Sequence, residues 1–388
     1  MAELQLANPD PVFIQEVKRL GGDTLKNCYQ CATCSAVCKL SPETNPFPRR
    51  EMLLAGWGQT ETLIKEPNLW LCYQCNDCTT YCPRGARPGD VLAAVRVFAY
   101  KHFSFPSFMG KAVASPSALP LLLLVPTILL LGCMFLFAPQ TADGSFQFLE
   151  SNVVDFNLFL PHSSIDALFV FGGVMIFLFA GIGMGRFWKG LRQPGQDYTL
   201  GFVSALILTI KEIISHSKFR ECEASHSRAI GHQLLIYGFV GAFVTTLMVF
   251  ALHFIPEYLH LWFRIESLHP FIEMPVEFPN PVKILGGLSG MAIIIGCGLL
   301  IARYWGTEDE SSSYSDNIFL YMMFFTSLTG MLSWFIRVAD MAMAAYVMYF
   351  LHLVCVFYIL WYMPYSKFAH MVFRTLALVH ARMIGRIQ

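Results

Sequence analysis

The stretches CYQCATCSAVC, residues 28–38, and CYQCNDCTTYC, residues 72–82, hold eight of the twelve cysteines in the chain. In each stretch two residues separate the first three cysteines from one another, and three residues precede the fourth. Pro83 follows the second stretch, whereas Lys39 follows the first. The chain therefore carries one cysteine pattern twice, and we find no other internal repeat.

This spacing predicts iron–sulfur ligation. Three thiolates two residues apart can hold three corners of one cubane, while the fourth cysteine of each run reaches the other cluster. The predicted ligands of two [4Fe-4S] clusters are Cys28, Cys31, Cys34 with Cys82, and Cys72, Cys75, Cys78 with Cys38. Zinc, an alternative, takes four ligands from two separated CxxC pairs, so each run has one cysteine too many. Disulfides are not expected, because they belong to oxidising compartments and residues 1–10 do not resemble a signal peptide.

Composition divides the chain in two. The 388 residues are 55% hydrophobic and 14% charged, whereas about 25% charged residues are usual in soluble domains. Residues 1–112 are polar, and long apolar runs begin at Val113. We therefore predict an all-α fold, with a helical two-cluster ferredoxin domain over residues 1–112 and a transmembrane di-haem cytochrome b domain over residues 113–388. The net charge is zero, so we expect no nucleic-acid partner.

Six apolar stretches are long enough to cross a membrane, which takes roughly 20 helical residues. They are residues 118–137, 167–188, 229–254, 284–301, 318–335 and 342–363. A further segment, residues 200–216, is apolar but contains Lys211 and Glu212. We expect it to form an amphipathic helix that lies at the membrane surface.

Lysine and arginine are unevenly distributed among the loops, which predicts the orientation of the spans. The loop over residues 189–228 carries six of them and the tail after Pro364 carries four, whereas residues 138–166 carry none. The loop over residues 255–283 has only Arg264 and Lys283. We therefore predict a multi-pass protein embedded in the lipid of the cytoplasmic (inner) membrane, with both termini and the cysteine-rich domain in the cytoplasm.

Four histidines lie on or beside two of the predicted spans, where ionisable residues are costly and usually functional. His352 and His370 are 18 residues apart, which is five full turns of a continuous helix and about 27 Å. His232 and His253 are 21 residues apart, about 31 Å and roughly 60° out of line. These spacings predict two b-type haems, held by His232 with His370 on the cytoplasmic side and by His253 with His352 on the outer side. The alternative for each is a hydrogen-bonded packing residue, and His226 or His216 would replace His253 if it is not a ligand.

Two parts of the sequence resemble known families. Residues 351–370, with LHL at 351–353 and MPYSKFAH at 363–370, resemble the last helix of the respiratory nitrate reductase gamma subunit family, in which two histidines bind two haems. The N-terminal third resembles the small iron–sulfur subunit of heterodisulfide reductase, a helical ferredoxin-like module. A fusion of the two resembles the QmoC family, the membrane subunits of the quinone-interacting membrane-bound oxidoreductases (Qmo) of sulfate-reducing bacteria.

This resemblance implies a function in electron transfer. It implies a quinone-facing subunit that exchanges electrons with menaquinone, and with two soluble flavin and iron–sulfur subunits similar to QmoA and QmoB. Through them the subunit would serve adenylylsulfate (APS) reductase in sulfate respiration. Such a chain acts as the non-flavin part of an oxidoreductase complex, and the sequence does not identify its catalytic residues. Flavin and nicotinamide belong to partners, since the chain has no G-x-G-x-x-G or Walker motif.

Two other interpretations concern the function of the whole chain. A subunit of a heterodisulfide reductase-like or sulfite-reduction-associated complex is the main alternative, although disulfide reduction itself would need Cys-Cys-Gly repeats that this chain lacks. A redox sensor is a third possibility, but no output domain is visible.

Two pairs of charged or ionisable residues are assigned candidate roles. Arg84 and Arg87, beside the second cysteine run, are hypothesised to raise a cluster potential. Glu257 and His260 are candidate proton carriers near the outer haem.

Overall fold

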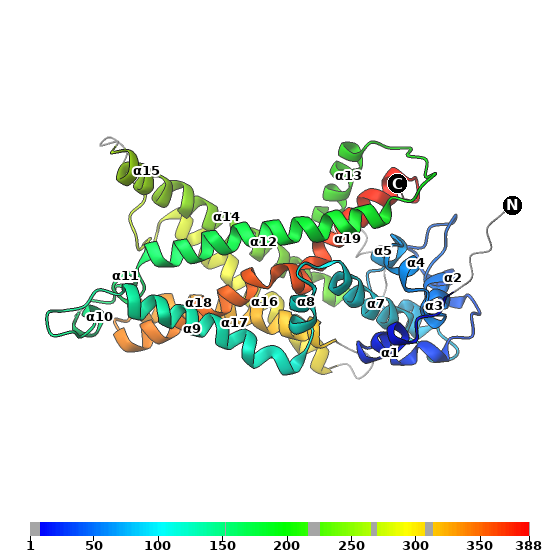
Figure 1. The fold of residues 1–388 in the computed structure, drawn as a ribbon, viewed down its shortest axis with the longest axis horizontal. Coiled ribbons are helices and arrows are strands. Elements are labelled where there is room, and N and C mark those ends of the chain that lie inside the picture. Colours follow the sequence, from blue (N-terminus) through cyan, green and yellow to red (C-terminus); the bar gives the residue numbers. More distant parts are fainter. Residues whose placement is uncertain (1–7, 152, 216–225, 265–269, 307–312, 388) are drawn as a thin grey trace.

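The computed structural model describes residues 8–151, 153–215, 226–264, 270–306 and 313–387, and within these ranges it is helical and contains no strand (Figure 1). The predicted all-α class is confirmed. Two short segments at the end of the bundle far from the cysteines, around Gln140 and Phe146, form an isolated bridge.

The cysteine-rich part consists of short helices packed around one longer helix. The long helix is α7 (Pro88–Phe103), which is buried along most of its length. The others are α1 (Pro11–Arg19), α2 (Thr33–Val37), α3 (Arg49–Gly56), α4 (Thr60–Ile64), α5 (Asn68–Leu71), α6 (Asp77–Thr80) and α8 (Ser107–Val113). The third cysteine of each run lies in a short helix, Cys34 in α2 and Cys78 in α6, and the other three cysteines of each run lie in the loops before and after it.

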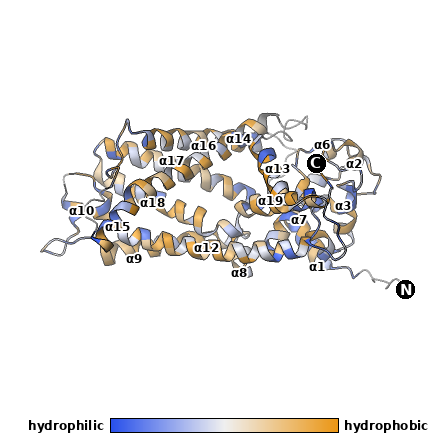
Figure 2. Ribbon diagram, turned by 90° about the horizontal axis from the view of Figure 1, so that it is seen from above, coloured by the Kyte–Doolittle hydropathy of each residue, from blue (hydrophilic) through white to orange (hydrophobic). Residues whose placement is uncertain are grey.

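Six long apolar helices follow, and the six predicted spans are confirmed. The six spans run over Pro116–Phe137, His162–Leu191, Ala229–Phe263, Pro281–Gly306, Tyr314–Val338 and Ala342–Trp361. Their principal helices are α9 (Leu119–Phe137), α12 (His162–Leu191), α14 (His226–Val249), α16 (Pro281–Gly306), α17 (Tyr314–Val338) and α18 (Ala342–Trp361). Hydrophobic residues dominate these helices, in contrast to the N-terminal end (Figure 2). The chain is therefore a multi-pass membrane protein.

The third span is longer than predicted. After α14 the helix continues through a π-helical turn, η5 (Phe250–Phe254), into α15 (Ile255–Phe263). Pro256 lacks the amide hydrogen that a continuous α-helix would need there, and the wider π-helical turn lies directly before it. The turn changes the helical phase, so the angular relation predicted between His232 and His253 does not hold.

The last apolar helix is interrupted, although the predicted alignment of its histidines assumes a continuous helix. α18 ends at Trp361, a 3₁₀ turn η6 (Met363–Tyr365) follows, and α19 (Lys367–Met383) begins as a separate helix. Pro364 breaks the pattern of backbone hydrogen bonds, and the Ser366 side chain caps α19 by accepting a hydrogen bond from the amide of Phe368. The expected alignment of His352 with His370 on one helix is therefore wrong.

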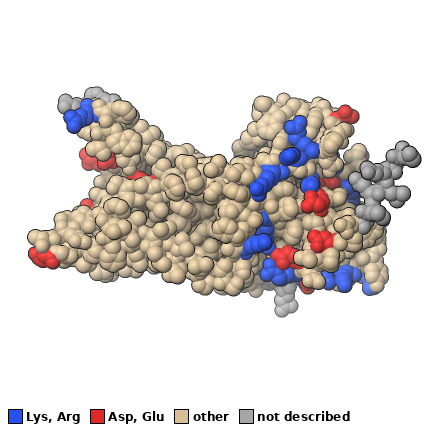
Figure 3. All heavy atoms as spheres, in the orientation of Figure 1, with Lys and Arg blue, Asp and Glu red and all other residues tan. Residues whose placement is uncertain are grey.

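The two parts of the chain share a core. Trp70 of α5 is fully buried, and its ring contacts Phe187 of α12 and Phe373 of α19 at centroid distances of 5.4 Å and 5.8 Å. The predicted amphipathic segment forms α13 (Phe202–Ser215), which packs on α19. On the face shown in Figure 3, Lys and Arg side chains gather at this end of the molecule, while the middle of the bundle carries few charges.

Candidate metal centres

Both cysteine runs have the same unusual backbone. Gln30 and Ala32 in the first run have φ angles of 61° and 69°, and Gln74 and Asn76, at the same positions of the second, have 54° and 69°. A left-handed conformation costs a residue with a side chain roughly 1–2 kcal/mol. In such loops successive backbone amides turn toward one side and form a concavity for an anion. Both runs are therefore shaped to wrap an anionic group such as a thiolate-bound cluster.

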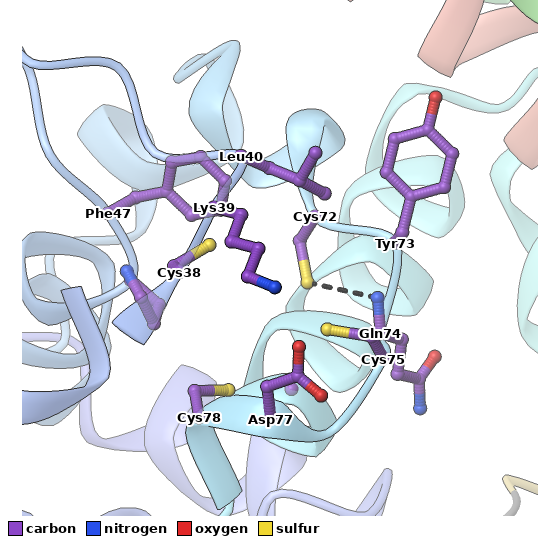
Figure 4. A pocket seen from close by; sticks show the side chains of 12 residues that line it. Cys38, Lys39, Leu40, Phe47, Cys72, Tyr73, Gln74, Cys75, Asp77 and Cys78 are labelled. Carbon is purple, nitrogen blue, oxygen red and sulfur yellow. Dashed lines mark hydrogen bonds between the residues drawn. The ribbon is translucent and has the colours of Figure 1, made fainter. Parts of the chain in front are cut away.

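The structure brings the fourth cysteine of the first run to the first three of the second. Cys38, Cys72, Cys75 and Cys78 line one pocket, and Figure 4 shows their sulfur atoms pointing into it. The helices after the two runs, α2 and α6, contact each other and hold the loops in this position. This is the crossed arrangement that the second predicted ligand set requires.

Three members of the first ligand set, Cys28, Cys31 and Cys34, also lie close together. Burial raises the pKa of Cys34 to about 11, and the nearby thiols of Cys28 and Cys31 act in the same direction. The segment after Cys82 joins them, because the Arg84 side chain donates a hydrogen bond to the Tyr29 hydroxyl at 3.0 Å. The end of the second run therefore lies beside the start of the first.

Among the described residues, the thiols of these runs are farther apart than the ligands of a single zinc ion. A tetrahedral zinc ion with Zn–S bonds of about 2.3 Å would hold its sulfur atoms roughly 3.8 Å apart. Among the described residues, no three Cys, His, Asp or Glu side chains are close enough to share one ion. Burial raises the pKa of Cys38 to about 12, and Cys72 adds to the effect. Four thiolates there need positive charge to be stable, which iron ions would supply.

Two arginines, the partly buried Arg374 and the buried Arg96, bind backbone carbonyls at the start of the second cysteine run. Arg374 of α19 donates hydrogen bonds to the carbonyls of Cys72 and Leu71 at 3.1 Å and 3.5 Å. Arg96 of α7 donates to the carbonyl of Leu69 at 3.0 Å and to that of Cys72 at 3.5 Å. Sequence reasoning missed both roles. For Arg374 a signal existed, since it lies one helical turn after His370.

His370 lies next to this loop. Its ring is 5.7 Å from that of Trp70, measured between centroids. Burial holds the pKa of His370 well below its usual value, and the charges of Arg96, Arg374, Lys367 and His232 act in the same direction. A neutral imidazole is the form that binds a metal. The structure thus places His232 of α14 near His370 of α19, as the predicted cytoplasmic pair requires.

Both members of the predicted outer pair lie next to backbone carbonyl groups. His253 has one ring nitrogen, Nδ1, 2.8 Å from the carbonyl oxygen of Ile272, and the other, Nε2, 3.3 Å from the Glu257 carboxylate. His352 has its Nδ1 3.0 Å from the carbonyl oxygen of Thr326 on α17. The Nδ1 contact of His352 leaves its Nε2 for a metal, because metal-bound histidines usually donate their other ring N–H to a carbonyl. Both ring nitrogens of His253 have protein partners. The pairing of His253 with His352 stays a prediction.

The other candidates can be placed briefly. His216 lies outside the described residues, and the structure places only the backbone of His226. Gly238 and Gly241 of α14 face α16. An added Cβ at Gly241 would lie 2.3 Å from the Ser289 hydroxyl, so these glycines serve close helix packing.

Two family models match different parts of the chain. Residues 24–86 match the 4Fe-4S dicluster domain, which supports iron–sulfur clusters in the cysteine-rich part. The C subunit of the H(2):CoB-CoM heterodisulfide,ferredoxin reductase of Methanothermobacter marburgensis is 34% identical over 112 residues, 29% of this chain and 60% of the relative. A protein of Archaeoglobus profundus that is named for its likeness to the C subunit of heterodisulfide reductase is 30% identical over 116 residues, 30% of this chain and 62% of the relative. The chain thus spans about 60% of the length of these relatives.

A second match covers the membrane helices. Citrate utilization protein B of Escherichia coli is 25% identical over 384 residues, 94% of this chain and 90% of the relative. No solved structure gave a significant match. Residues 111–388, most of the chain, match the family of citrate utilization protein B, and the chain therefore belongs to that family.

Proposed function

We propose that this chain is the membrane electron-transfer subunit of a quinone-linked oxidoreductase complex. It passes electrons between menaquinol in the membrane and two soluble flavin and iron–sulfur subunits, similar to QmoA and QmoB. The coarser role, an iron–sulfur subunit associated with an oxidoreductase, is supported by the dicluster match and by the heterodisulfide reductase relatives. In this proposal residues 1–112 form the cluster domain and residues 113–388 the membrane domain.

One observation carries the proposal: the second cysteine run rests directly on the helix of His370. Arg374 of α19 binds the Cys72 carbonyl, and His370 lies against Trp70, two residues before that cysteine. The bound groups would supply the redox chemistry, and the protein fixes their positions and surroundings. A thiol set and a candidate haem ligand are therefore held together by one short loop and one helix.

The metal ligands follow from this placement. We propose one [4Fe-4S] cluster on Cys28, Cys31, Cys34 and Cys82 and a second on Cys38, Cys72, Cys75 and Cys78. His232 and His370 are proposed to bind a b-type haem at the end of the bundle next to the second cluster. A second haem between His253 and His352 stays a separate prediction: the Nδ1 contact of His352 leaves Nε2 for iron, whereas both ring nitrogens of His253 have protein partners.

Charge supports a cytoplasmic position for the clusters. Lys and Arg gather where the cysteine-rich part meets the bundle (Figure 3), and cytoplasmic loops of membrane proteins carry such an excess. We propose that the chain lies in the cytoplasmic (inner) membrane with both termini in the cytoplasm. There, reducing conditions keep the thiols available for iron.

The electron acceptor distinguishes two candidate functions. The Qmo resemblance points to APS reductase, reached through the flavin subunits. The relatives of the N-terminal part favour a second candidate, a heterodisulfide reductase-like complex. Similarity to citrate utilization protein B extends over most of both chains, which indicates that this combination of domains also occurs in a protein named for a different metabolism.

A redox titration of the purified chain tests the proposal. We expect EPR signals of two [4Fe-4S] centres and the optical bands of b-type haem, and we expect anaerobic menaquinol to reduce the haem. A preparation without haem would refute the histidine assignment, and haem that menaquinol does not reduce would refute the quinone linkage. With the native complex, turnover with APS reductase or with a heterodisulfide then decides between the two acceptors.

A further inference from the structure

The two cysteine runs carry a tyrosine at the same position. Tyr29 follows the first cysteine of the first run, and Tyr73 follows the first cysteine of the second. Each ring lies beneath an arginine, Arg84 at 4.1 Å and Arg374 at 3.8 Å from the ring centroid. The duplicated sequence thus presents two equivalent faces, each built from a tyrosine and an arginine beside a thiol set.

The face around Tyr73 is covered by the membrane domain of the same chain. The Tyr73 hydroxyl donates a hydrogen bond to the Glu212 carboxylate of α13 at 2.9 Å, and Arg374 comes from α19. Arg382 of α19 pairs with the other oxygen of that carboxylate at 2.5 Å, and both side chains are buried. The molecule itself therefore shows how such a face is occupied: by helices that bring a carboxylate and a cation.

The equivalent face around Tyr29 is open. Tyr29 is 68% exposed and Tyr81, next to Cys82, is 57% exposed. Among the eight cysteines of the two runs, Cys31 is the one classed as exposed. Helix α2, which begins in this run, lies at the end of the molecule away from the bundle (Figure 1). Exposed aromatic and arginine side chains are enriched in protein interfaces.

The open face carries positive charge without a carboxylate partner. Arg84 and Arg49 are both exposed, and the Arg49 amide donates a hydrogen bond to the Ser35 hydroxyl of the first run at 3.1 Å. Within the described part of the chain, neither arginine has a carboxylate within 4 Å. By analogy with Glu212 at the covered face, the missing component is a carboxylate from another molecule.

We propose that the face formed by Tyr29, Cys31, Tyr81 and Arg84 is the docking surface for a redox subunit with an acidic contact surface. Carboxylates of that subunit pair with Arg84 and Arg49, and its redox centre lies beside the first thiol set. The inference rests on the proposed electron-transfer function and specifies which thiol set lies next to which partner. The second thiol set faces the membrane helices, and the first faces the soluble partner.

Footprinting of the native complex tests the surface directly. Hydroxyl radicals modify exposed tyrosines, so the purified complex is compared with the chain after its partners have been released by salt. We expect modification of Tyr29 and Tyr81 to fall severalfold in the complex, while Tyr198, which is 41% exposed at another site, stays unchanged. Equal modification of Tyr29 and Tyr81 in both samples would overturn the proposal.

Charge reversal gives a second, independent measurement. Arg84→Glu is expected to lower the flavin that co-purifies with the chain about tenfold, because like charges then face each other. Arg264→Glu is the matched control, since Arg264 is exposed at the end of α15, on a different helix from the cysteine runs. Unchanged flavin content in Arg84→Glu, or an equal loss in both variants, would contradict the proposed surface.

Other occupants produce different results. Protection of Tyr29 in the isolated chain that grows with its concentration would indicate a second copy, and protection by lipid vesicles alone would indicate a membrane. Either result overturns the proposal. The underlying function is tested separately, by menaquinol reduction of the wild-type chain without partners. If that reduction fails while the flavin subunit still protects Tyr29, the quinone linkage is wrong and the docking surface stands.

Discussion

The guanidinium group of Arg374 lies 3.8 Å from the centre of the Tyr73 ring and donates a hydrogen bond of 3.1 Å to the carbonyl of Cys72. One side chain of α19 therefore binds two adjacent residues of the second cysteine run. Since His370 lies one turn earlier on the same helix, the relative position of the thiol set and the imidazole depends on this contact.

Replacing Arg374 with Gln is expected to lower the midpoint potential of the cluster on the second thiol set. The positive charge beside Cys72 favours the more negative, reduced form of the cluster. Its loss is expected to lower the midpoint potential by on the order of 60 mV, or about 1.4 kcal/mol for one electron. Arg374→Lys keeps the charge but not the paired hydrogen bonds, so its shift should be smaller. An EPR-monitored redox titration measures both.

A matched control removes a charge elsewhere. Arg192→Gln alters an exposed arginine after α12, outside the cysteine pocket, and should leave both cluster potentials unchanged. If Arg374→Gln titrates like the wild type, the arginine has a structural role only. Arg84 and Arg87 are measured in the same way, and unchanged midpoints in their Gln variants would refute the hypothesis made for them from the sequence.

Removing either member of the histidine pair is expected to remove haem and spare the clusters. His232→Ala and His370→Ala should each lose the b-type optical bands, because a six-coordinate haem needs both imidazoles, while the EPR signals of the iron–sulfur centres remain. His253→Ala should keep the bands, since its ring nitrogens face Ile272 and Glu257. Loss of haem in His253→Ala, with haem retained in His370→Ala, would reverse the assignment.

The sequence predicted those features that depend on local composition and spacing. Six apolar runs of sufficient length gave six spans, and the cysteine spacing anticipated the meeting of Cys38 with the second run. The predicted angular relations between histidines assumed continuous α-helices, and they failed where the helix changes type, at the π-helical turn near His253 and at Pro364. The contact of Arg374 with Cys72 joins residues 302 positions apart. The periodic pattern of apolar residues in a sequence carries no signal for a contact between such distant residues.

Glu51 is expected to make stability depend on pH. Burial raises the pKa of this α3 carboxyl from 4.5 to about 7, and the hydrogen bond from Asn68 at 3.2 Å offsets only part of the effect. The folded protein therefore holds a proton that the unfolded chain has lost between these values. The free energy of unfolding contributed by Glu51 consequently falls as pH rises from about 4.5 to 7.

Glu51→Gln removes this titration and keeps an oxygen for Asn68. We expect the variant to gain up to about 3 kcal/mol in free energy of unfolding above pH 7, and little near pH 4.5. Thermal unfolding in detergent at several pH values measures the difference. A variant that gains the same amount at every pH would show that packing, and not ionisation, distinguishes the two side chains.

The crossed ligand sets make a prediction about which cysteine variants share a defect. Cys38 and Cys75 line the same pocket although they belong to different runs, so Cys38→Ala and Cys75→Ala should perturb the same EPR signal. Cys82→Ala and Cys31→Ala should perturb the other. If each run instead held its own cluster, Cys38→Ala would match Cys31→Ala. Because the comparison is between pairs of variants, general destabilisation of the cluster domain would affect both signals in all four and cannot imitate the crossed pattern.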